Sequence, residues 1–509
     1  PNFRLFLTAL PNVDFPLGLL HMSIKCTNEP PSGLKAGLLR SYTTIVDQDR
    51  IERIESEEWR KLLYCLCTMH SVAIERRRFG PLGFNVPYEF SDGDLLSCIL
   101  FLEKMLYNSG EVNWQTLQYA VSVVFYGGKL TQSMDNRFFQ TFASEWLTNS
   151  ATADKPAFLE SGEYRKVIGE RPEEDSPLDM GLHSNANLTY QLNEANALFQ
   201  RLSSTQPKGG GGSSGGASRE DAVLKRAAEL LGRLPRDYPE DDVRTELRKQ
   251  GGLSVPLNIF LYQELQRFQA VLGKVRYILE QLRLSIKGEV VMTEELNDTL
   301  ESLMVGDVPY LFENTVTGDE FSWRLPNVGL WVESLLQRDR QYRGWLEQGR
   351  PKAYWLPGFF NPAGLLTSIR QEACRRLNRG EGKVPLDNMV YVNEVLPYER
   401  AEQMKQMPED GILVYGMVLE GSGFERSGCV LTESRPKELH VSLPLMHITA
   451  MPRAKAASKK REFGELYSCP VYKYGRRGDS YLVAMADLKV GEATMNHWTM
   501  RGVALLLNK

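Results

Sequence analysis

The feature that most constrains the fold is a long segment with a single apolar seam. Apolar side chains recur at alternating spacings of four and three residues over 261–286. The seam consists of Leu261, Leu265, Phe268, Leu272, Val275, Leu279, Leu282 and Ile286. A period of 3.5 residues predicts one long helix lying along a partner surface. A coiled-coil dimer and packing along other helices of the same protein both satisfy the pattern. Packing within the protein is favoured, because a single segment without a matching second one makes a poor dimer.

Length and composition indicate a globular protein of several domains. The chain has 509 residues, of which 42% are hydrophobic and 24% charged, and its formal net charge is −4. That length predicts about two to four domains, and the small charge gives no electrostatic case for nucleic acid. No apolar run approaches the roughly 20 residues that span a bilayer, and no signal peptide is recognisable.

The first part of the sequence is expected to be a fragment of sheet followed by helices. FRLFLTA (3–9) has the character of a buried strand without a preceding turn, as if cut from its sheet. Residues 51–79 have helical spacing, so one helix is predicted there. Its apolar stripe comprises Trp59, Leu62, Leu63, Leu66, Met69 and Val72.

Two further helices are predicted after a break. GPLGFNVPYEF (80–90), with two prolines and two glycines, ends the first helix. Ser91 or Asp92 is suited to cap a helix over 94–106. Another helix is expected from Trp114 to Val124, ending at the Gly127–Gly128 pair.

The strongest boundary is the flexible stretch QPKGGGGSSGGAS (206–218), which follows a polar, proline-rich segment at 155–182. The composition leaves open whether this linker is natural or engineered. Ser218 and Asp221 resemble a capping box at its exit. The helix expected there has the apolar positions Val223, Ala227, Leu230 and Leu234.

The last third of the sequence has a different character. After another apolar helix near 331–346, runs rich in β-branched and aromatic residues alternate with short turns beyond about residue 388. These runs are 390–396, 412–420, 440–450, 465–474 and 480–488. The pattern predicts an antiparallel meander closed as a barrel or packed as a sandwich.

No motif for nucleotide chemistry is found. A phosphate loop requires a strand, GxxxxGK[ST] and a helix, and this sequence contains no GxxxxGK[ST]. In GLKAGLLRS (33–41) the lysine lies between the glycines, and a helix beginning after Pro31 is sufficient to explain the stretch. GEGKV (380–384) is interpreted as a turn.

Candidate metal and catalytic residues do not form a constellation either. Cys65, Cys67 and His70 lie together in CLCTMH, but residues two apart point about 200° away from each other on a helix, so buried thiols are favoured. His440 and His447 are expected on opposite faces of strand-like sequence. The RGD at 477–479 and the two N-glycosylation sequons are interpreted as chance matches. We therefore expect no catalytic, cofactor-binding or metal-binding residues.

Clustered charges have simpler interpretations. Arg76, Arg77 and Arg78 could contact acidic groups on a neighbouring module, although a solvated helix end is favoured. The acidic pairs Glu294–Glu295 and Asp241–Asp242 suit the first turns of helices, where they complement the macrodipole.

Several collinear stretches resemble the C-terminal part of dynein heavy chains. FRLFLTALPNVDFPLGLLHMSIKCTNEPPSGLKAGLLRSY (3–42) is similar to the end of the large subdomain of the sixth AAA+ module. ERRRFGPLGFNVPYEFSDGDL (75–95) and YGGKLTQSMDNR (126–137) resemble that module's small subdomain. Similarity to the C-terminal domain is carried by YWLPGFFNPAGLLTSIRQE (354–372), LVYGMVLEGSGFE (413–425), LYSCPVYKY (466–474) and RGVALLLN (501–508). Phe84 stands where a tryptophan is common.

The resemblance implies a multidomain α+β organisation. Residues 1–50 would be a remnant of an α/β AAA+ large subdomain and 51–150 the helical small, or lid, subdomain. Residues 151–217 would connect to the C-terminal domain, with a Gly-rich patch that is usual in these relatives. Residues 218–387 would form its helical part and 388–509 its antiparallel β-barrel-like part.

The resemblance also implies a function. It is closest to axonemal heavy chains, most like the flagellar outer-arm gamma type, which belong to ATP-driven, minus-end-directed microtubule motors of cilia and flagella. This polypeptide would be a non-hydrolysing segment that couples and caps the AAA+ ring, with ATP and magnesium bound in earlier modules. Implied partners are the remaining AAA+ modules and linker, other heavy, intermediate and light chains, and microtubules through the stalk. No nucleic acid or membrane is implied. The implied location is the cytoplasm, in the cytoskeleton of the axoneme.

Two hypotheses follow. In the first, the helix at 261–286 is a strut across the ring, its seam buried on neighbouring modules, and the opening strand is completed by them. In the alternative, the protein is a free-standing helical and β-barrel adaptor without motor activity. An orphan buried strand at 3–9 argues against the adaptor, because its backbone groups would be unpaired.

Overall fold

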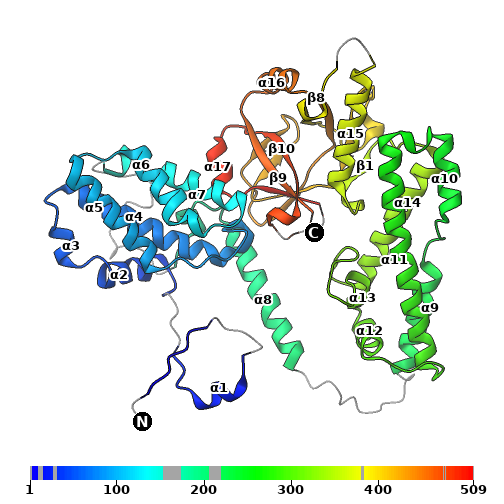
Figure 1. Cartoon of the computed structure of the whole chain (residues 1–509), viewed down its shortest axis with the longest axis horizontal. Helices are drawn as coiled ribbons and strands as arrows, with labels where there is room; N and C mark the ends of the chain where they lie inside the picture. The colour runs from blue at the N-terminus through cyan, green and yellow to red at the C-terminus, as the bar shows by residue number, and fades with distance from the viewer. Residues whose placement is uncertain are drawn as a thin grey trace.

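The computed structural model describes residues 3–9, 15–26, 31–152, 174–205, 219–379, 383–473, 475 and 477–507. The protein has two main apolar cores, and Figure 1 shows the helices and strands that contribute to them. The helical core is built from residues between Leu34 and Ala186, with Met500 added from near the end of the sequence. The second core runs from Val223 to Leu507 and includes both helices and sheets. The fold is thus mixed helix and sheet, as expected.

The helical core confirms most of the predicted helices. Every residue of the predicted stripe, from Trp59 to Val72, is buried in α4. The helix is shorter than predicted, since residues 53–56 separate it from α3 and a 3₁₀ segment, η1, follows it. The elements are α2 (Leu34–Thr44), α3 (Gln48–Glu52), α4 (Glu57–Arg76), η1 (Arg77–Leu82), α5 (Asp92–Ser109), α6 (Trp114–Tyr119), α7 (Ser133–Trp146) and η7 (Pro177–Met180).

The predicted helix boundaries in this core are largely confirmed. Ser91 caps α5 in a reciprocal capping box with Asp94. The helix predicted from Trp114 continues from α6 into a π-helical turn, η2 (Ala120–Phe125), and a 3₁₀ turn at Gly127–Lys129. Phe84 is buried and packs edge-on against Phe138.

The prediction of a buried strand at 3–9 is wrong for this structure. These residues form no strand, and their large apolar side chains are exposed, including Phe3, Leu5 and Phe6. The short helix α1 (Leu17–Met22) buries none of its residues. A strand is stable only when its backbone groups are paired, and no strand among the described residues pairs with this segment.

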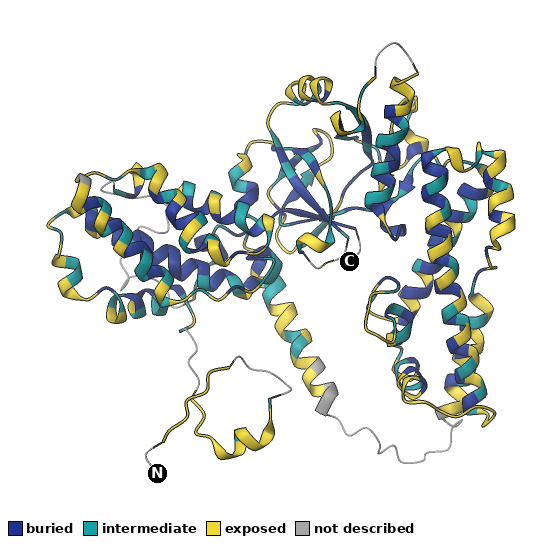
Figure 2. Ribbon diagram, viewed as in Figure 1, coloured by how far each residue is buried: buried dark blue, intermediate teal, exposed yellow. Residues whose placement is uncertain are grey.

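A long helix, α8 (Ala186–Thr205), leaves the helical core and projects from it (Figure 1). Figure 2 shows that most of this helix is exposed or only half-buried, in contrast to α4. The linker at 206–218 with its Ser218 cap, most of the segment 155–182, and residues 380–382 of GEGKV lie outside the described residues.

The predicted seam forms one helix, α11, and is buried within this protein. From Leu261 to Leu282 every seam residue is at most 1% exposed, and Ile286 packs against the same core. Helices that contact α11 include α9, α10, α12, α13 and α15, and α14, whose Tyr342 donates a hydrogen bond to Glu264. Packing inside the same polypeptide is therefore confirmed, and the hypothesis of a seam buried on neighbouring modules is wrong. The helices are α9 (Arg219–Arg233), α10 (Glu240–Lys249), α11 (Pro256–Ile286), α12 (Glu294–Val305), α13 (Tyr310–Glu313), α14 (Val328–Gln348) and α15 (Pro362–Leu377).

The strands form two sheets rather than one antiparallel meander. One has the order β1-β3-β8-β2 and the other β5-β6-β10-β9-β11-β4-β7. The outer strands β5 and β7 of the second sheet contact each other, so it is nearly closed as a barrel. The strands are β1 (Tyr354–Trp355), β2 (Met389–Val395), β3 (Ile412–Tyr415), β4 (Val418–Glu420), β5 (Gly423–Glu425), β6 (Val430–Thr432), β7 (His440–Ser442), β8 (Met446–Pro452), β9 (Leu466–Tyr472), β10 (Leu482–Lys489) and β11 (Ala504–Leu506).

The meander prediction is wrong in connectivity. The runs 412–420 and 440–450 each divide into two strands that belong to different sheets. β1 pairs with β3, β6 with β10, and β11 with β9, all in parallel. Two helices lie between the strands, α16 (Arg453–Glu462) and α17 (Met495–Met500). None of the described helices is long and apolar enough to cross a membrane.

Candidate functional site: the joint between the helical core and the barrel

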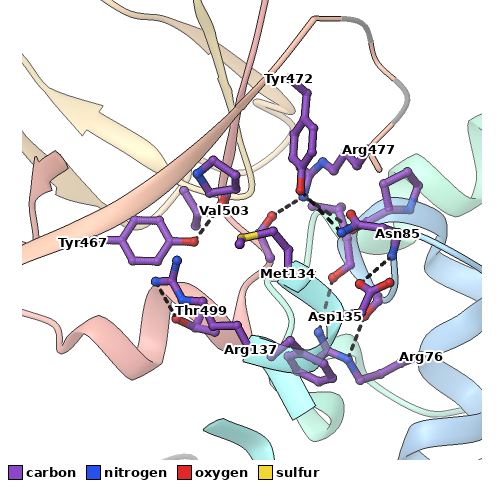
Figure 3. Close-up of a pocket in the computed structure, with 16 residues that line it drawn as sticks. Arg76, Asn85, Met134, Asp135, Arg137, Tyr467, Tyr472, Arg477, Thr499 and Val503 are labelled. Carbon is purple, nitrogen blue, oxygen red and sulfur yellow. Dashed lines mark hydrogen bonds between the residues drawn. The ribbon is translucent and has the colours of Figure 1, made fainter. Parts of the chain in front are cut away.

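The two cores meet at one polar contact region, which we call the joint (Figure 3). It is formed by the end of α4, η1, the start of α7 and the start of α8 on one side. On the other side lie β4, β9, the loop after β9, and α17. A small cavity of about 40 Å³ lies between them. Because a single water requires about 10–15 Å³, this cavity has room for a few waters and none for a nucleotide.

Arg76 connects the helical core to the last helix, α17. Its guanidinium is fully buried and stacks 4.0 Å from the ring centre of Phe138. It donates hydrogen bonds to four backbone carbonyl oxygens, those of Leu82, Gly83, Met180 and Met500. The bond to Met500 is 3.0 Å long and spans 424 residues of sequence. A buried cation is costly unless its donors are satisfied, so this side chain holds three segments together, at residues 82–83, at Met180 and at Met500.

A second buried arginine holds the barrel side of the joint. Arg477 forms an ion pair of 2.5 Å with Glu420 on β4, and both side chains are at most 10% exposed. Arg477 also donates to the carbonyl oxygens of Gly502 and Pro81. Glu420 in turn lies 3.1 Å from Nε2 of His440. This network joins β4, β7 and the turn that follows α17 to η1.

Helix α7 contacts the barrel side of the joint through polar side chains that include Arg137 and Ser133. Arg137 donates to the carbonyl oxygen of Ser468 at 2.6 Å and lies 4.9 Å from the ring centre of Tyr467. The Ser133 amide and hydroxyl both donate to the Asp479 carboxylate, at 2.9 and 2.6 Å. Burial raises the pKa of Tyr467, so its hydroxyl stays protonated and donates to the carbonyl oxygen of Val503.

The base of α8 is fixed to the barrel through Asn185. Its amide nitrogen donates to the carbonyl oxygens of Arg435 and Glu438, at 2.8 and 3.1 Å. Its amide oxygen accepts from the Lys437 backbone N–H at 2.9 Å. Both polar atoms of the Asn185 side chain are therefore used in one interdomain contact.

Close backbone approach completes the joint. Gly502 has φ +65°, and a Cβ there would lie 2.6 Å from the carbonyl oxygen of Leu82. A Cβ at Gly181 would lie 2.8 Å from the Met500 side chain. Only glycine permits this backbone conformation and separation without strain.

The residues considered from sequence do not gather at the joint, apart from Arg76, His440 and the RGD at 477–479. Cys65 and Cys67 are buried in α4, where burial raises the pKa of Cys67 to about 12. His70 is buried and hydrogen-bonded to Tyr126 at 2.8 Å, and burial lowers its pKa to about 4. In the part of the sequence that the structure describes, no three His, Cys, Asp or Glu residues are placed to hold a metal ion.

The two histidines near the sheets have separate partners. His440 contacts Glu420, whereas His447 lies 2.6 Å from the carbonyl oxygen of Asp410. They do not lie on opposite faces of one strand, as predicted, but in two strands of different sheets, β7 and β8. Asp241–Asp242 and Glu294–Glu295 occupy the first turns of α10 and α12, as predicted.

The stretch GLKAGLLRS forms the start of α2, as predicted, and its first amides are occupied. Gly33 donates its N–H to Glu75 at 2.8 Å, and Leu34 donates to Asp175 at 2.7 Å. A helix N-terminus attracts anions, and here two carboxylates of the same protein take that place. The stretch therefore has a structural explanation.

The interpretation of the arginine cluster as a solvated helix end is wrong for Arg76. Arg78 does contact an acidic group, Glu75 at 3.1 Å, but this partner lies three residues before it in the same segment. No sequence pattern selects Arg477, Glu420 or Asn185. Arg477 begins the RGD, and its burial shows that this tripeptide is part of the joint. Long-range partners of this kind leave no local pattern, so spacing alone could not have found them.

The structure therefore consists of a helical domain joined to a domain that contains a nearly closed barrel. The family models agree: the AAA lid domain of the dynein heavy chain matches residues 59–186, and the C-terminal domain of the dynein heavy chain matches residues 192–507. The protein belongs to the dynein heavy chain family.

Curated relatives match almost the whole sequence. Mouse dynein axonemal heavy chain 5 is 38% identical over 517 residues, and human dynein axonemal heavy chain 8 is 36% identical over 519 residues. The dynein gamma chain of the flagellar outer arm of Chlamydomonas reinhardtii is 34% identical over 530 residues. Each alignment includes 99% of the present sequence and 11% of the relative. The 509 residues therefore span about a tenth of the length of these relatives.

Proposed function

We propose that this polypeptide is the C-terminal, non-hydrolysing segment of an axonemal dynein heavy chain. In this proposal, residues 1–50 end the large subdomain of the sixth AAA+ module and 51–150 form its lid. Residues 151–217 connect to the C-terminal domain, whose helical part is 218–387 and whose barrel-like part is 388–509. The full-length protein would be an ATP-driven, minus-end-directed microtubule motor of the ciliary or flagellar axoneme.

The observation that carries the proposal is the joint. Arg76, Arg477 and Asn185 place buried hydrogen bonds across the contact between the lid-like core and the barrel. Packed, hydrogen-bonded contacts move as units rather than deform continuously. The segment would thus transmit movement of the lid to the C-terminal domain as one rigid body, and no catalytic group of its own is required.

The route of coupling differs from the strut hypothesis. The seam of α11 is used inside the C-terminal domain, so it is not available for neighbouring modules. Contacts to the remaining AAA+ modules and linker would instead use surfaces that are apolar and exposed here. These are the arm formed by residues 3–9 and 15–24, and the outer part of α8, with Phe6, Ile24 and Phe199 as examples. Exposed apolar groups of this size mark interaction sites.

The remaining partners and cofactors follow from the family. ATP and magnesium would bind in earlier AAA+ modules of the parent protein. Other dynein heavy, intermediate and light chains would be partners within the axonemal arm, and microtubules would bind through the stalk. A free-standing adaptor is not favoured, because the whole-length matches are to segments of heavy chains.

The proposal is tested by breaking the joint in a full-length heavy chain. Replacing the buried pair by Arg477→Met and Glu420→Gln should lower microtubule-stimulated ATPase activity and gliding velocity while nucleotide affinity in the earlier modules is unchanged. The matched control is the exposed ion pair Arg426–Glu399, at 2.7 Å with both side chains about half-exposed. Arg426→Met with Glu399→Gln should have no effect. A folded joint variant with normal ATPase activity and gliding would refute the proposal.

A further inference from the structure

A large hollow lies on the side of the C-terminal domain away from the joint. Its volume is about 920 Å³, which is within the range of ligand-binding clefts. It lies between the end of α15, the start of α11, the last residues of β8 and the start of α16, near the top of Figure 1. None of the residues that form it belongs to the joint.

The hollow has an excess of positive charge. Six basic and three acidic side chains line it, namely Arg350, Arg375, Arg376, Arg379, Lys455 and Lys459 against Glu372, Glu409 and Asp410. Glu372 pairs with Arg350 at 2.9 Å, and Asp410 pairs with Arg376. The other four cations form no ion pair with an acidic side chain within the described residues. The protein as a whole has a net charge of −4, so the positive charge of the hollow is opposite in sign to the net charge of the protein.

One wall of the hollow is an open strand edge. β8 pairs with β2 along its full length, from Met446 to Pro452. On its other side β8 pairs with β3 only as far as Ile448, opposite Ile412. Within the described residues, no strand covers β8 beyond Ile448 on that side. Thr449, Ala450 and Met451 therefore line the hollow.

Gly411 explains why the edge is open. It has φ +81°, and a Cβ at this position would lie 2.2 Å from the carbonyl oxygen of Ile448. The backbone thus lies close to β8 at this glycine, in a conformation that does not continue the strand, and the pairing ends at Ile412. An unpaired edge is a template for another strand.

We propose that this hollow binds an acidic segment of another polypeptide in extended conformation. The segment would add as a strand to β8 at residues 449–452, in the manner of β-strand addition. Its carboxylates would contact Arg375, Arg379, Lys455 and Lys459, and its apolar side chains would contact Ile369, Leu377 and Ile412. Nucleic acid fits less well, because no phenylalanine, tyrosine or tryptophan is among the described residues that line the hollow.

Binding can be measured by fluorescence anisotropy, with the 509-residue protein and a labelled peptide of about ten residues in which glutamate and valine alternate. Lys455→Glu with Lys459→Glu should weaken binding at least about tenfold at low ionic strength, since surface charge pairs each contribute modestly. The matched control is Arg453→Glu with Arg461→Glu. These exposed residues lie on the same helix and make the same charge change, but neither lines the hollow.

The two double variants distinguish binding in the hollow from non-specific attraction of the peptide to positive charge on α16. Loss of binding in the Lys455/Lys459 variant alone supports the site, provided that its circular dichroism is unchanged. Equal loss in both variants, or no binding by the wild-type protein, overturns the proposal. An oligothymidylate that binds more tightly than the peptide, with the same sensitivity to Lys455 and Lys459, would assign the hollow to nucleic acid instead.

Strand addition has a separate test. In an extended peptide the N–H groups of alternate residues point to the same edge. N-methylation of all valines or of all glutamates therefore blocks one edge at a time. One of the two methylated peptides should lose binding and the other should keep it. Equal binding of both, at the affinity of the unmodified peptide, would refute pairing with β8.

Discussion

Helices α8 and α11 have the same apolar spacing and opposite environments. In α11 the seam from Leu261 to Leu282 is buried against other helices of this protein. In α8, Leu188, Leu192, Ala195, Phe199 and Leu202 repeat at the same alternating spacings of four and three. Leu192, Phe199 and Leu202 are nevertheless more than half exposed.

The difference shows what the apolar period determines. It predicts that a helix has one face to bury, and it contains no information about which surface buries it. For α11 that surface lies within the same polypeptide. For α8 the burial is concentrated at the base, at Asn185 and Ala186.

The largest expected effect tests this contrast directly. Leu272→Asp with Leu279→Asp places two unpaired carboxylates in the core of the C-terminal domain. We expect destabilisation by more than about 5 kcal/mol, because unpaired buried charges are costly. Urea unfolding followed by circular dichroism measures the change.

The matched variant in α8 is Leu192→Asp with Leu198→Asp, at positions that are 52% and 56% exposed. It should change the unfolding free energy by less than about 1 kcal/mol. Comparable destabilisation in both variants would show that α8 is covered in solution, and the contrast would fail.

The next largest change in the free energy of unfolding is expected at the joint, from which α8 projects. Arg76→Met leaves four buried carbonyl oxygens without their donor. We therefore expect the free energy of unfolding to fall by about 3–5 kcal/mol. Faster amide hydrogen exchange in α17 would show that the barrel side is released. Arg78→Met removes an arginine two residues away whose side chain is 35% exposed. A loss of about 1 kcal/mol or less is expected there, and equal losses would contradict a special role for Arg76.

A smaller effect depends on pH and involves the helical core alone. Burial lowers the pKa of His70 to about 4, whereas the unfolded state has a value near 6.5. Below about pH 6.5 the unfolded state therefore binds the proton first, and stability falls until about pH 4, by up to about 3 kcal/mol. The urea midpoints of wild type and His70→Phe should run parallel above about pH 7 and diverge between about pH 6 and 4. An unchanged acid dependence in the variant would rule out His70 as the cause.

The smallest effect separates backbone strain from close contact. Gly502→Ala should cost about 2 kcal/mol, because its φ of +65° is strained for alanine and its Cβ would meet Leu82. Gly464→Ala shares a positive φ, +80°, but has no atom within 4 Å of the new Cβ. It should cost about 1 kcal/mol. Equal thermal shifts of the two variants would mean that the contact with Leu82 adds nothing.

Local patterns predicted much of the helical architecture. The stripe from Trp59 to Val72, the Ser91 cap and the seam of α11 depend on neighbours within a few turns, and the structure confirms them. The prediction of a strand at 3–9 was wrong, because a strand depends on pairing partners that local sequence does not specify. The predicted order of the strands was wrong for the same reason. β11, near the end of the sequence, pairs in parallel with β9, and no local pattern indicates this pairing.

The joint was beyond prediction by spacing. Arg76 attracted notice only as one of three adjacent arginines, and its partner Met500 has no feature that marks it. Arg477 and Glu420 are separated by 57 residues, and nothing in either local sequence indicates a buried ion pair. Polar groups of this kind acquire their role from tertiary packing alone.

The long reach of Arg76 has a consequence for biosynthesis. The carbonyl oxygen of Met500 is translated 424 residues after the guanidinium that binds it. At about 5–20 residues per second, the ribosome needs roughly 20–85 seconds to supply that acceptor. Throughout this interval the guanidinium can be bonded to the carbonyl oxygens of Leu82, Gly83 and Met180 but lacks its fourth acceptor, so the last bond of this buried cation forms only after elongation has reached α17.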